Sequence, residues 1–439
     1  MTFDEAQRYL LASYKTDNKK GLKELGRALE ILGNPQDGLK IIHVAGTNGK
    51  GSVCAMLGSV LAAQGYRAGC FTSPHLEVVN ERFTINGQMI GGGDFARHMA
   101  KVAHAAQKLY GPGGSFSFFE ILTLIALDYF CESKVDFLLF EVGIGGRLDA
   151  TNVIKSPILT IIMSIGMDHM EVLGDTVEKI AEEKAGIIKE NCPVVLYPNP
   201  QMVYNVIAEI ARTKNAKIYH INETIASGIE STAELTKFFV PHEYFGEMCI
   251  ELSLIGHYQM RNALTAIEAA AALARAGYAI DACAVKRGLA TVKWGGRMEI
   301  VAKNPMVVLE GAHNLQGAEA AARDMAFLFA DKKITLLTGV LMDKEHDRIV
   351  RTLAAGADKV VFTKPLYDFK AVAPGVLAKA LDGHRADKEI YVVENCLEAL
   401  QKAIEITCCD DVIFCSGSLY LVGDIRGVFV NGVKDDEND

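Results

Sequence analysis

The sequence lacks the features that carry a chain into a membrane, out of the cell or onto nucleic acid. No uninterrupted apolar segment among the 439 residues reaches the roughly 20 that span a bilayer. The opening stretch MTFDEAQRYL has acidic side chains and no basic segment before an apolar core, so it does not resemble a signal peptide. A formal net charge of −9 gives no basic footprint for nucleic acid or an anionic membrane. We therefore expect a cytoplasmic protein with neither a membrane nor a nucleic-acid partner.

The cysteine pattern and the length limit the class further. The ten cysteines form no pair at C-x-x-C spacing, and most of them lie inside apolar runs. This pattern favours buried, reduced thiols over a zinc site or a disulfide framework. A chain of 439 residues is too long for one core, so two or three domains are expected.

From residue 40 onward, short apolar runs rich in β-branched residues alternate with longer segments of helical period. This alternation predicts an α/β fold in which a mostly parallel, P-loop-type sheet is flanked by helices. We assign this first domain to residues 1–295. Its strands are expected at 40–46, 66–73, 135–143, 157–166 and 193–198, and its helices include 50–65, 118–130, 176–189 and 262–277.

A Trp-Gly-Gly turn at residues 294–296 interrupts the helical pattern, and the alternation of strands and helices then restarts. Two glycines before a new strand are typical of a hinge, although a turn inside one large domain gives the same pattern. We predict a smaller, Rossmann-like α/β domain at residues 296–439. Its strands are expected at 306–314, 333–340, 359–365, 389–395 and 411–418.

The stretch HVAGTNGKGS at residues 43–52 is similar to a phosphate-binding loop, with two departures. Val44 stands where the first glycine of a common P-loop belongs, and the hydroxyl that should follow Lys50 is displaced to Ser52. Glycines let backbone amides approach an anion, while the following helix points its positive end at it. Lys50 would contact the β- and γ-phosphates, and the absence of a G-x-G-x-x-G pattern favours a nucleoside triphosphate over a dinucleotide.

Three possible metal ligands follow other strands of the same sheet. Ser73 lies in TSPH, Glu141 ends an apolar strand, and His169 lies in MDHMEVLG. Ligands gather at the carboxyl ends of strands in an open parallel sheet, so these side chains should meet at one edge. Each residue alone favours a structural role, but together they supply the ligands that the displaced P-loop hydroxyl does not.

Other polar segments are less specific. Lys184 has Glu182 and Glu183 beside it, a pattern that by composition favours a solvated helix face. In the second domain, EGAHN at 310–314 and GSLYLVGD at 417–424 follow predicted strands. Their glycines and polar atoms can face the first domain across a cleft.

Ten motifs in order along nearly the whole chain resemble those of the folylpolyglutamate synthase and dihydrofolate synthase family, relatives of the Mur ligases. They are HVAGTNGKGS, TSPH, FFE, EVGIGGRLDATN, DHMEVLG, AEEKAGI, GHYQMRNA, GGRME, GAHN and GSLYLVGD. The resemblance implies ATP-dependent amide formation. A substrate carboxylate takes the γ-phosphoryl group to give an acyl phosphate, the α-amine of L-glutamate attacks it, and ADP and phosphate leave. Such catalysis depends mainly on positioning and charge neutralisation.

The resemblance also implies roles for individual residues of the first domain. Ser73 and Glu141 would hold one Mg²⁺, and His169 would serve a second. Lys184 matches a family lysine that is carbamylated by CO₂, which requires a neutral amine and hence a partly buried side chain with a lowered pKa. The phosphates of ATP would be cradled by Lys50 and the amides of Gly46, Thr47, Asn48, Gly49, Gly51 and Ser52.

Domain closure would complete the nucleotide site in this family. The family usually has Asp-Gly-Ala-His-Asn-Pro, whereas this chain has Glu310 for the aspartate and Leu315 for the proline. Glutamate keeps the charge but reaches one methylene further. The residues that match the family's nucleotide contacts are Asn262 in the first domain and Arg297, Glu310 and His313 in the second. Ser418 matches a substrate contact.

The substrate that receives the glutamate is still to be assigned. The segment GGRLDATN resembles the version in bifunctional enzymes that also glutamylate dihydropteroate, where Phe119 and Asp149 would lie near the pterin. Arg147 would be a substrate contact or an ordinary solvated loop residue. The implied partners are L-glutamate, reduced folates and dihydropteroate, and family analogy alone suggests a monomer.

Two rival interpretations remain open from the sequence. A P-loop regulatory ATPase would need only the first domain, and leaves TSPH, DHMEVLG and the second domain unexplained. A Mur-type ligase acting on a peptidoglycan precursor usually carries an additional N-terminal domain, whereas only residues 1–39 precede the first expected strand.

Overall fold

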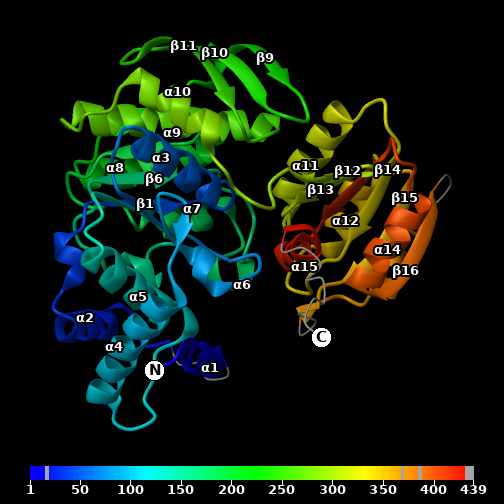
Figure 1. Ribbon diagram of the computed structural model, residues 1–439. Coiled ribbons are helices and arrows are strands. Elements are labelled where there is room, and N and C mark those ends of the chain that lie inside the picture. The colour runs from blue at the N-terminus through cyan, green and yellow to red at the C-terminus, as the bar shows by residue number, and fades with distance from the viewer. Residues whose placement is uncertain (15–18, 367–369, 384–387, 431–439) are drawn as a thin grey trace, which may run out of the picture.

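The computed structural model describes residues 1–14, 19–366, 370–383 and 388–430. Figure 1 shows two α/β bodies, one built on an eight-stranded sheet and the other on a six-stranded sheet. A small three-stranded sheet lies at the top of the first body. The predicted α/β class is confirmed.

The eight-stranded sheet has the order β4-β3-β2-β5-β1-β6-β7-β8. Strands β2, β5, β1, β6, β7 and β8 are parallel, and β3 and β4 run antiparallel at one edge. Every residue of β1 and β5 is buried, because helices cover both faces of a parallel sheet. The bounds are β1 Ile41–Ala45, β2 Ala68–Phe71, β3 Phe83–Ile85, β4 Gln88–Met89, β5 Phe137–Glu141, β6 Leu159–Ile162, β7 Val194–Leu196 and β8 Ile218–His220.

Alternation along β1 divides the core of the first body into two layers. Ile42 and Val44 pack against α3 (Lys50–Ala63), α9 (His257–Arg275) and α10 (Ala282–Thr291). Ile41 joins the core on the opposite face. The helices on that face and at the sheet edges are α1 Phe3–Tyr14, α2 Leu22–Ile31, α4 Gly92–Tyr110, α5 Phe118–Glu132, α6 Met170–Leu173, α7 Val177–Ala185 and α8 Gln201–Thr213.

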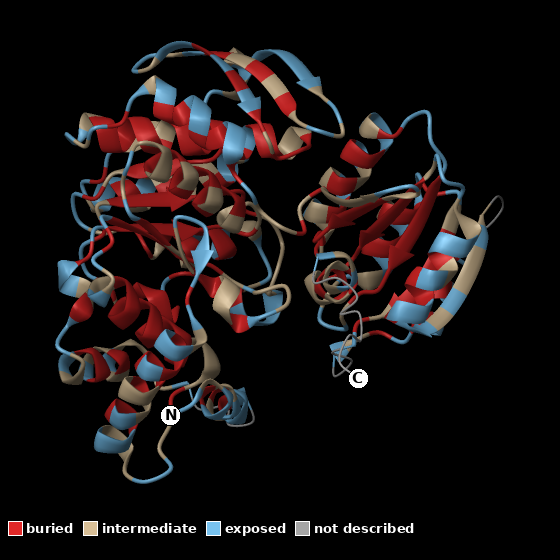
Figure 2. Cartoon of the chain, in the orientation of Figure 1, coloured by how far each residue is buried: buried red, intermediate tan, exposed pale blue. Residues whose placement is uncertain are grey.

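The three-stranded antiparallel sheet was not predicted from the sequence. It consists of β9 (Ser227–Ser231), β10 (Thr236–His242) and β11 (Gly246–Leu252). Phe238 and Ile250 point inward and join the core formed by α3 and α9, while the outer face is more exposed (Figure 2). This sheet therefore covers helices rather than the central sheet.

The second body has the strand order β12-β13-β17-β14-β15-β16, parallel except for β12. Helices α11, α12 and α13 cover one face, and α14 and α15 cover the other. The strands are β12 Glu299–Lys303, β13 Met306–Glu310, β14 Ile334–Thr338, β15 Lys359–Lys364, β16 Glu389–Asn395 and β17 Val412–Ser416. The helices are α11 Leu315–Leu328, α12 His346–Ala354, α13 Pro374–Lys379, α14 Cys396–Ile406 and α15 Leu419–Val430.

All ten cysteines are free thiols. The expectation that they are buried holds for four, two others are half-buried, and it is wrong for the remaining four. Cys249 points outward because β11 alternates between exposed and buried positions, and Cys283 lies in the first turn of α10. Cys408 and Cys409 are exposed between α14 and β17. Among the helices of the described residues, none has the length and apolar composition needed to cross a bilayer.

Candidate active site

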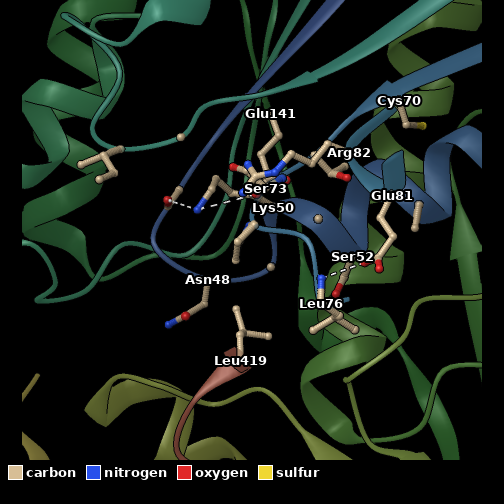
Figure 3. Close-up of a pocket in the computed structure, with 18 of the residues that line it drawn as sticks. Asn48, Lys50, Ser52, Cys70, Ser73, Leu76, Glu81, Arg82, Glu141 and Leu419 are labelled. Carbon is tan, nitrogen blue, oxygen red and sulfur yellow. Dashed lines mark hydrogen bonds and ion pairs between the residues drawn. The ribbon is translucent and has the colours of Figure 1, made fainter. Parts of the chain in front are cut away.

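A cavity of about 1400 Å³ lies at the carboxyl ends of the strands of the first body and extends to the second. Its walls include the loop after β1, the segment 72–76, the loop 143–149 and the residues that follow β17. Figure 3 shows Lys50, Ser73, Glu141 and Arg82 converging on one side of this cavity. The polar ends of several strands are thus brought together, as the sequence predicted.

The phosphate-loop sequence forms a tight turn between β1 and α3. Gly46 has a φ of 154°, and a Cβ atom there would lie 2.6 Å from Cβ of Met163, so a larger residue would not fit. Gly49 caps α3 with a φ of 84°, in the left-handed region that glycine tolerates. The amide of Thr47 donates to the carbonyl of Ser164 at 2.7 Å. The start of α3 consequently presents its free amides to the cavity, which suits an anionic group.

Two lysines share one backbone acceptor beneath this loop. Nζ of Lys50 and Nζ of Lys184 lie 3.1 Å and 2.9 Å from the carbonyl oxygen of Gly46. Lys184 is only 4% exposed, so the solvated position that its acidic neighbours favoured is wrong. Burial, followed by repulsion from Lys50, lowers the pKa of Lys184 to about 7. The expectation of a buried lysine with a lowered pKa is confirmed.

The three predicted metal ligands all line the cavity. Oε2 of Glu141 accepts the backbone amide of Ser73 at 2.9 Å, and Oε1 lies 3.9 Å from Nζ of Lys50. Burial raises the pKa of Glu141, while Lys50 and the Ser73 amide oppose this effect. His169 caps α6 with a φ of 50°, and burial lowers its pKa. The Glu141 carboxylate and the Ser73 hydroxyl are the oxygen donors that Mg²⁺ prefers.

Three predicted residues reach the cavity from the second body: Arg297, His313 and Ser418. Nδ1 of His313 donates to the carbonyl of Gly311 at 2.9 Å, which leaves Nε2 as an acceptor. Burial lowers the pKa of His313 to about 4, so the ring is neutral at pH 7. Ser418 lies between β17 and α15 and is 1% exposed.

Asn262 and Glu310 lie behind the cavity wall rather than on it. Asn262 packs against Gly49, and its Nδ2 donates to Oε1 of Gln259 at 2.9 Å. Glu310 accepts the Tyr258 hydroxyl at 2.6 Å and pairs with Arg297 at 3.4 Å. The longer side chain of Glu310 therefore holds Arg297 from behind, and direct nucleotide contacts by Asn262 and Glu310 stay predictions.

The candidate pterin side of the cavity is formed by α5 and the loop 143–149. The ring of Phe119 packs against Gly143, next to the Asp149 carboxylate. Asp149 is 5% exposed. Arg147 is exposed and pairs with Oε1 of Glu183 at 2.6 Å, so it is held at the rim instead of moving freely in solvent.

Sequence reasoning missed several charged cavity residues. Arg82 is buried, and its Nε donates to Nδ1 of His75 at 2.8 Å. Lys344 pairs with Asp168 across the two bodies at 2.6 Å, with both side chains less than one tenth exposed. Although burial opposes it, the Lys344 ammonium holds the pKa of Asp168 well below its usual range. These residues lie in loops without a glycine-rich signal, although Asp168 directly precedes the predicted His169.

Further contacts join the two bodies around the cavity. Asn48 and Asn314 exchange hydrogen bonds of 3.2 Å and 3.0 Å between their side-chain amides. On the other side, Leu76 joins the core beneath α15, and Arg426 of α15 pairs with Glu77 at 2.5 Å. Both the phosphate loop and the segment that carries Ser73 are therefore fixed to the second body.

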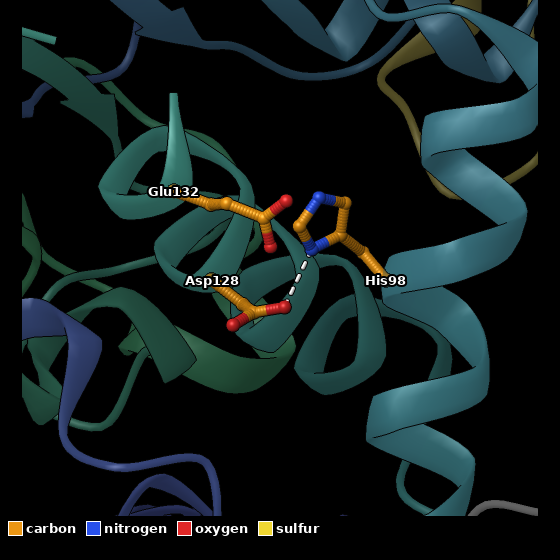
Figure 4. A group of neighbouring side chains, drawn as sticks. All are labelled: His98, Asp128 and Glu132. Atoms are coloured by element: carbon orange, nitrogen blue, oxygen red, sulfur yellow. Dashed lines mark hydrogen bonds and ion pairs between the residues drawn. The ribbon is translucent and has the colours of Figure 1, made fainter. Parts of the chain in front are cut away.

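One polar cluster lies away from this site, between α4 and α5 (Figure 4). His98, Asp128 and Glu132 have donor atoms close enough to hold a metal ion. Lys101, however, lies 2.9 Å from Asp128 and 2.8 Å from Glu132, and Arg97 also pairs with Glu132. Because these cations already balance the carboxylates, the cluster is best explained as an ion-pair link between the helices.

The chain matches two domain models of known proteins. Residues 44–270 match the Mur ligase middle domain, and residues 296–419 match the Mur ligase glutamate ligase domain. The dihydrofolate synthase/folylpolyglutamate synthase of Bacillus subtilis is 35% identical over 97% of this chain and 98% of its own length. The folylpolyglutamate synthase of Lacticaseibacillus casei is 31% identical over 98% of this chain and all of its own length.

Solved structures agree with these matches. Mycobacterium tuberculosis folylpolyglutamate synthase complexed with ADP superposes with a TM-score of 0.88 at 29% identity, over 98% of each chain. E. coli FolC in complex with DHPP and ADP superposes with a TM-score of 0.84 at 28% identity, over 98% of this chain and 97% of the other. With both domain models in order and full-length relatives above 30% identity, this chain belongs to the folylpolyglutamate synthase and dihydrofolate synthase family of the Mur ligase superfamily.

Proposed function

We propose that this chain is an ATP-dependent ligase that adds L-glutamate to folates through an acyl phosphate, and that it also glutamylates dihydropteroate. One observation carries the proposal: a phosphate-binding helix start, a buried carboxylate and residues of the glutamate ligase domain face one cavity. The ADP-bound M. tuberculosis relative and E. coli FolC with DHPP and ADP support the same ligands here. An ATPase switch or a peptidoglycan ligase is not favoured, because full-length relatives carry folate synthase names.

The residues of the phosphate loop would bind and orient ATP. The amides of the loop from Gly46 to Ser52 would donate hydrogen bonds to the phosphate oxygens, and Lys50 would neutralise charge on the β- and γ-phosphates. From the second body, Arg297 and His313 would contact the nucleotide. Ser418 would contact the substrate. Because both bodies contribute, the reacting carboxylate and the γ-phosphate would be held in line while water is excluded.

We infer that two Mg²⁺ ions bind in this cavity. Ser73 and Glu141 would hold one ion, and His169 would hold the second. The ions would neutralise charge on the transferring phosphoryl group when bound. Oε1 of Glu141 faces Lys50 at 3.9 Å without a backbone donor, which leaves an oxygen for a cation.

Lys184 would be carbamylated. Its uncharged amine attacks CO₂, a new N–C bond forms, and one proton leaves the nitrogen to give an anionic carbamate. The pKa of about 7 supplies the neutral amine at physiological pH. Mass spectrometry of the intact native protein in bicarbonate should show an added mass of about 44 Da, that of one CO₂, which Lys184→Arg lacks. An unmodified mass in bicarbonate would contradict this role.

The pterin would lie against Phe119 and Asp149, with Arg147 at the rim of the cavity. A monomeric state and a cytoplasmic location stay predictions.

The test is ADP formation with Mg²⁺-ATP and L-glutamate, with dihydropteroate in one reaction and tetrahydrofolate in another, and with product masses recorded. Turnover with both, each product gaining glutamyl units, supports the bifunctional proposal. Turnover with tetrahydrofolate alone restricts the enzyme to folylpolyglutamate synthesis. Lys50→Gln is the matched negative control for contaminating ligase. ADP formation that needs no glutamate, or none with either pterin, contradicts the proposal.

A further inference from the structure

A fully buried histidine lies in the middle of β1, below the cavity. His43 is 0% exposed, and its Nε2 lies 2.9 Å from Oγ1 of Thr151. Burial lowers the pKa of His43 to about 3, so the ring is neutral. Its Nδ1 has no hydrogen-bond partner among the described residues. The proposed reaction leaves this histidine without a role.

The hydrogen bonds beyond His43 form a chain that leads to the cavity wall. Oγ1 of Thr151 lies 2.6 Å from Oδ1 of Asp149, which also accepts the Thr151 amide at 3.0 Å. Oδ2 of Asp149 accepts the amide of Ile144 at 3.1 Å. These loop amides stabilise the ionised form of Asp149, although burial raises its pKa.

When Asp149 is ionised, the hydrogen bonds that link His43, Thr151 and Asp149 can have only one donor-to-acceptor direction. A carboxylate can only accept, so the Thr151 hydroxyl donates its proton to Asp149. The same hydroxyl oxygen must then accept from His43, which places the ring proton on Nε2 and leaves Nδ1 as the unpaired acceptor. The hydrogen-bond series therefore assigns the ring proton to Nε2 and makes the unpartnered Nδ1 an acceptor.

The end of the chain determines the shape of the cavity. Asp149 closes the loop 143–149 on itself through the Ile144 amide, and this loop and Phe119 form one wall. We infer that His43 is a positioning residue for the pterin side of the site, acting through Thr151 and Asp149 to fix the loop 143–149. The identity of the ligand in this inference rests on the proposed function. The hydrogen bonds from His43 to Asp149 are independent of it.

The test compares variants that interrupt the hydrogen bonds from His43 to Asp149 with variants that preserve the polar atoms in that series. His43→Leu and Thr151→Val remove the donor and the relay, whereas His43→Gln retains an N–H group and Thr151→Ser retains the hydroxyl. Thr160→Val is the matched control: Thr160 lies beside His43 in the same sheet, is fully buried, and its hydroxyl contacts Cys192 at 3.5 Å. Hydrogen–deuterium exchange of the loop 143–149 is measured together with KM for dihydropteroate, KM for ATP and kcat.

We expect His43→Leu and Thr151→Val to speed exchange in the loop and to raise KM for dihydropteroate about tenfold, as for one lost buried hydrogen bond. KM for ATP should stay within about twofold, and the Leu/Val double variant should be no worse than either single one. His43→Gln, Thr151→Ser and Thr160→Val should retain the wild-type KM and loop exchange.

Unchanged loop exchange in both chain-breaking variants would overturn the inference, whatever the substrate proves to be. So would an equal rise in both KM values, or the same loss in Thr160→Val, because either result indicates general destabilisation. If the wild-type protein turns over no pterin, the proposed function fails, and the exchange measurement alone decides whether His43 fixes the loop.

Discussion

Lys50 and Lys184 donate to the same carbonyl oxygen, that of Gly46, and their ammonium groups repel each other. Burial is the main cause of the lowered pKa of Lys184, and repulsion from Lys50 adds to it. At the residue scale, one tight turn thus places Lys50 at the phosphate loop and, beside it, a buried amine that can react.

The titration of Lys184 should be visible in the stability of the protein. Its pKa falls from 10.5 to about 7 on folding, so between these values the unfolded chain holds a proton that the native protein has released. Stability must therefore rise with pH across this window, by at most about 1.4 kcal/mol per pH unit. We expect the difference in unfolding free energy between wild type and Lys184→Met, measured by urea denaturation in CO₂-free buffer, to shift in favour of wild type from pH 7 to pH 9. A difference that does not depend on pH would contradict the lowered pKa.

Sequence reasoning located the residues of this site where glycines or strand ends mark them. Lys50 lies shortly after one buried strand and Glu141 is the last residue of another, so the edge of a parallel sheet was enough to bring them together. Arg82 and Lys344 could not be found in this way, because their positions depend on loop conformation and on the contact between the two bodies. Likewise, the turn of Glu310 away from the cavity depends on Tyr258, a residue from the other body.

At the scale of elements, the segment between β2 and β3 acts together with α15. Its Ser73 meets Glu141 in the site, and three residues later the carbonyl oxygen of Leu76 lies so near Gly423 that an added Cβ would be 2.2 Å away. Gly423 is buried in the first half of α15. The close approach of helix and loop therefore requires a residue without a side chain.

Gly423→Ala should reduce both activity and stability. Alanine favours an isolated helix by about 1 kcal/mol, but its Cβ would force the backbone of Leu76 away and, with it, Ser73. We expect kcat for ADP formation to fall by about 10- to 100-fold and the thermal midpoint to fall as well. Gly375→Ala in α13, where a Cβ atom meets nothing within 4 Å, is the control and should be fully active. Equal activity of the two variants would show that the segment is not held by α15.

Strands that consist of an uninterrupted run of apolar residues were predicted well from the sequence. Strands such as β1 and β14 are buried along their whole length, so uninterrupted apolar runs identify them. The strands β9 to β11 were missed because their outer residues are polar and the sheet packs on helices instead of the main sheet. Pattern alone cannot show which surface such a sheet covers.

At the scale of the whole molecule, the two bodies meet through polar groups as well as through Leu76. Asp168 and Lys344 form a buried pair, and Asn314 donates to Asp168 at 3.2 Å while also bonding Asn48. Loss of one partner would leave a buried charge without compensation.

The Asp168 and Lys344 pair should behave as a coupled unit. Lys344→Met should destabilise the protein by about 3 kcal/mol or more, and the double variant Asp168→Asn/Lys344→Met should lose less than that single variant. Thermal midpoints of the four proteins would measure the coupling. Arg212→Met, which breaks the exposed pair with Glu209, should change stability by no more than about 0.5 kcal/mol. Additive losses would indicate that the pair is not buried in solution.

Because both bodies line the cavity, the contact between them affects how much ATP is hydrolysed without forming ligated product. An acyl phosphate hydrolyses if water reaches it before the amine does, and residues of both bodies line the cavity in which it would form. Each weakening of that contact by about 1.4 kcal/mol lowers the ratio of closed to open molecules tenfold. The first effect of a weakened interface would therefore be uncoupled hydrolysis: ATP would be consumed and phosphate released without ligated product.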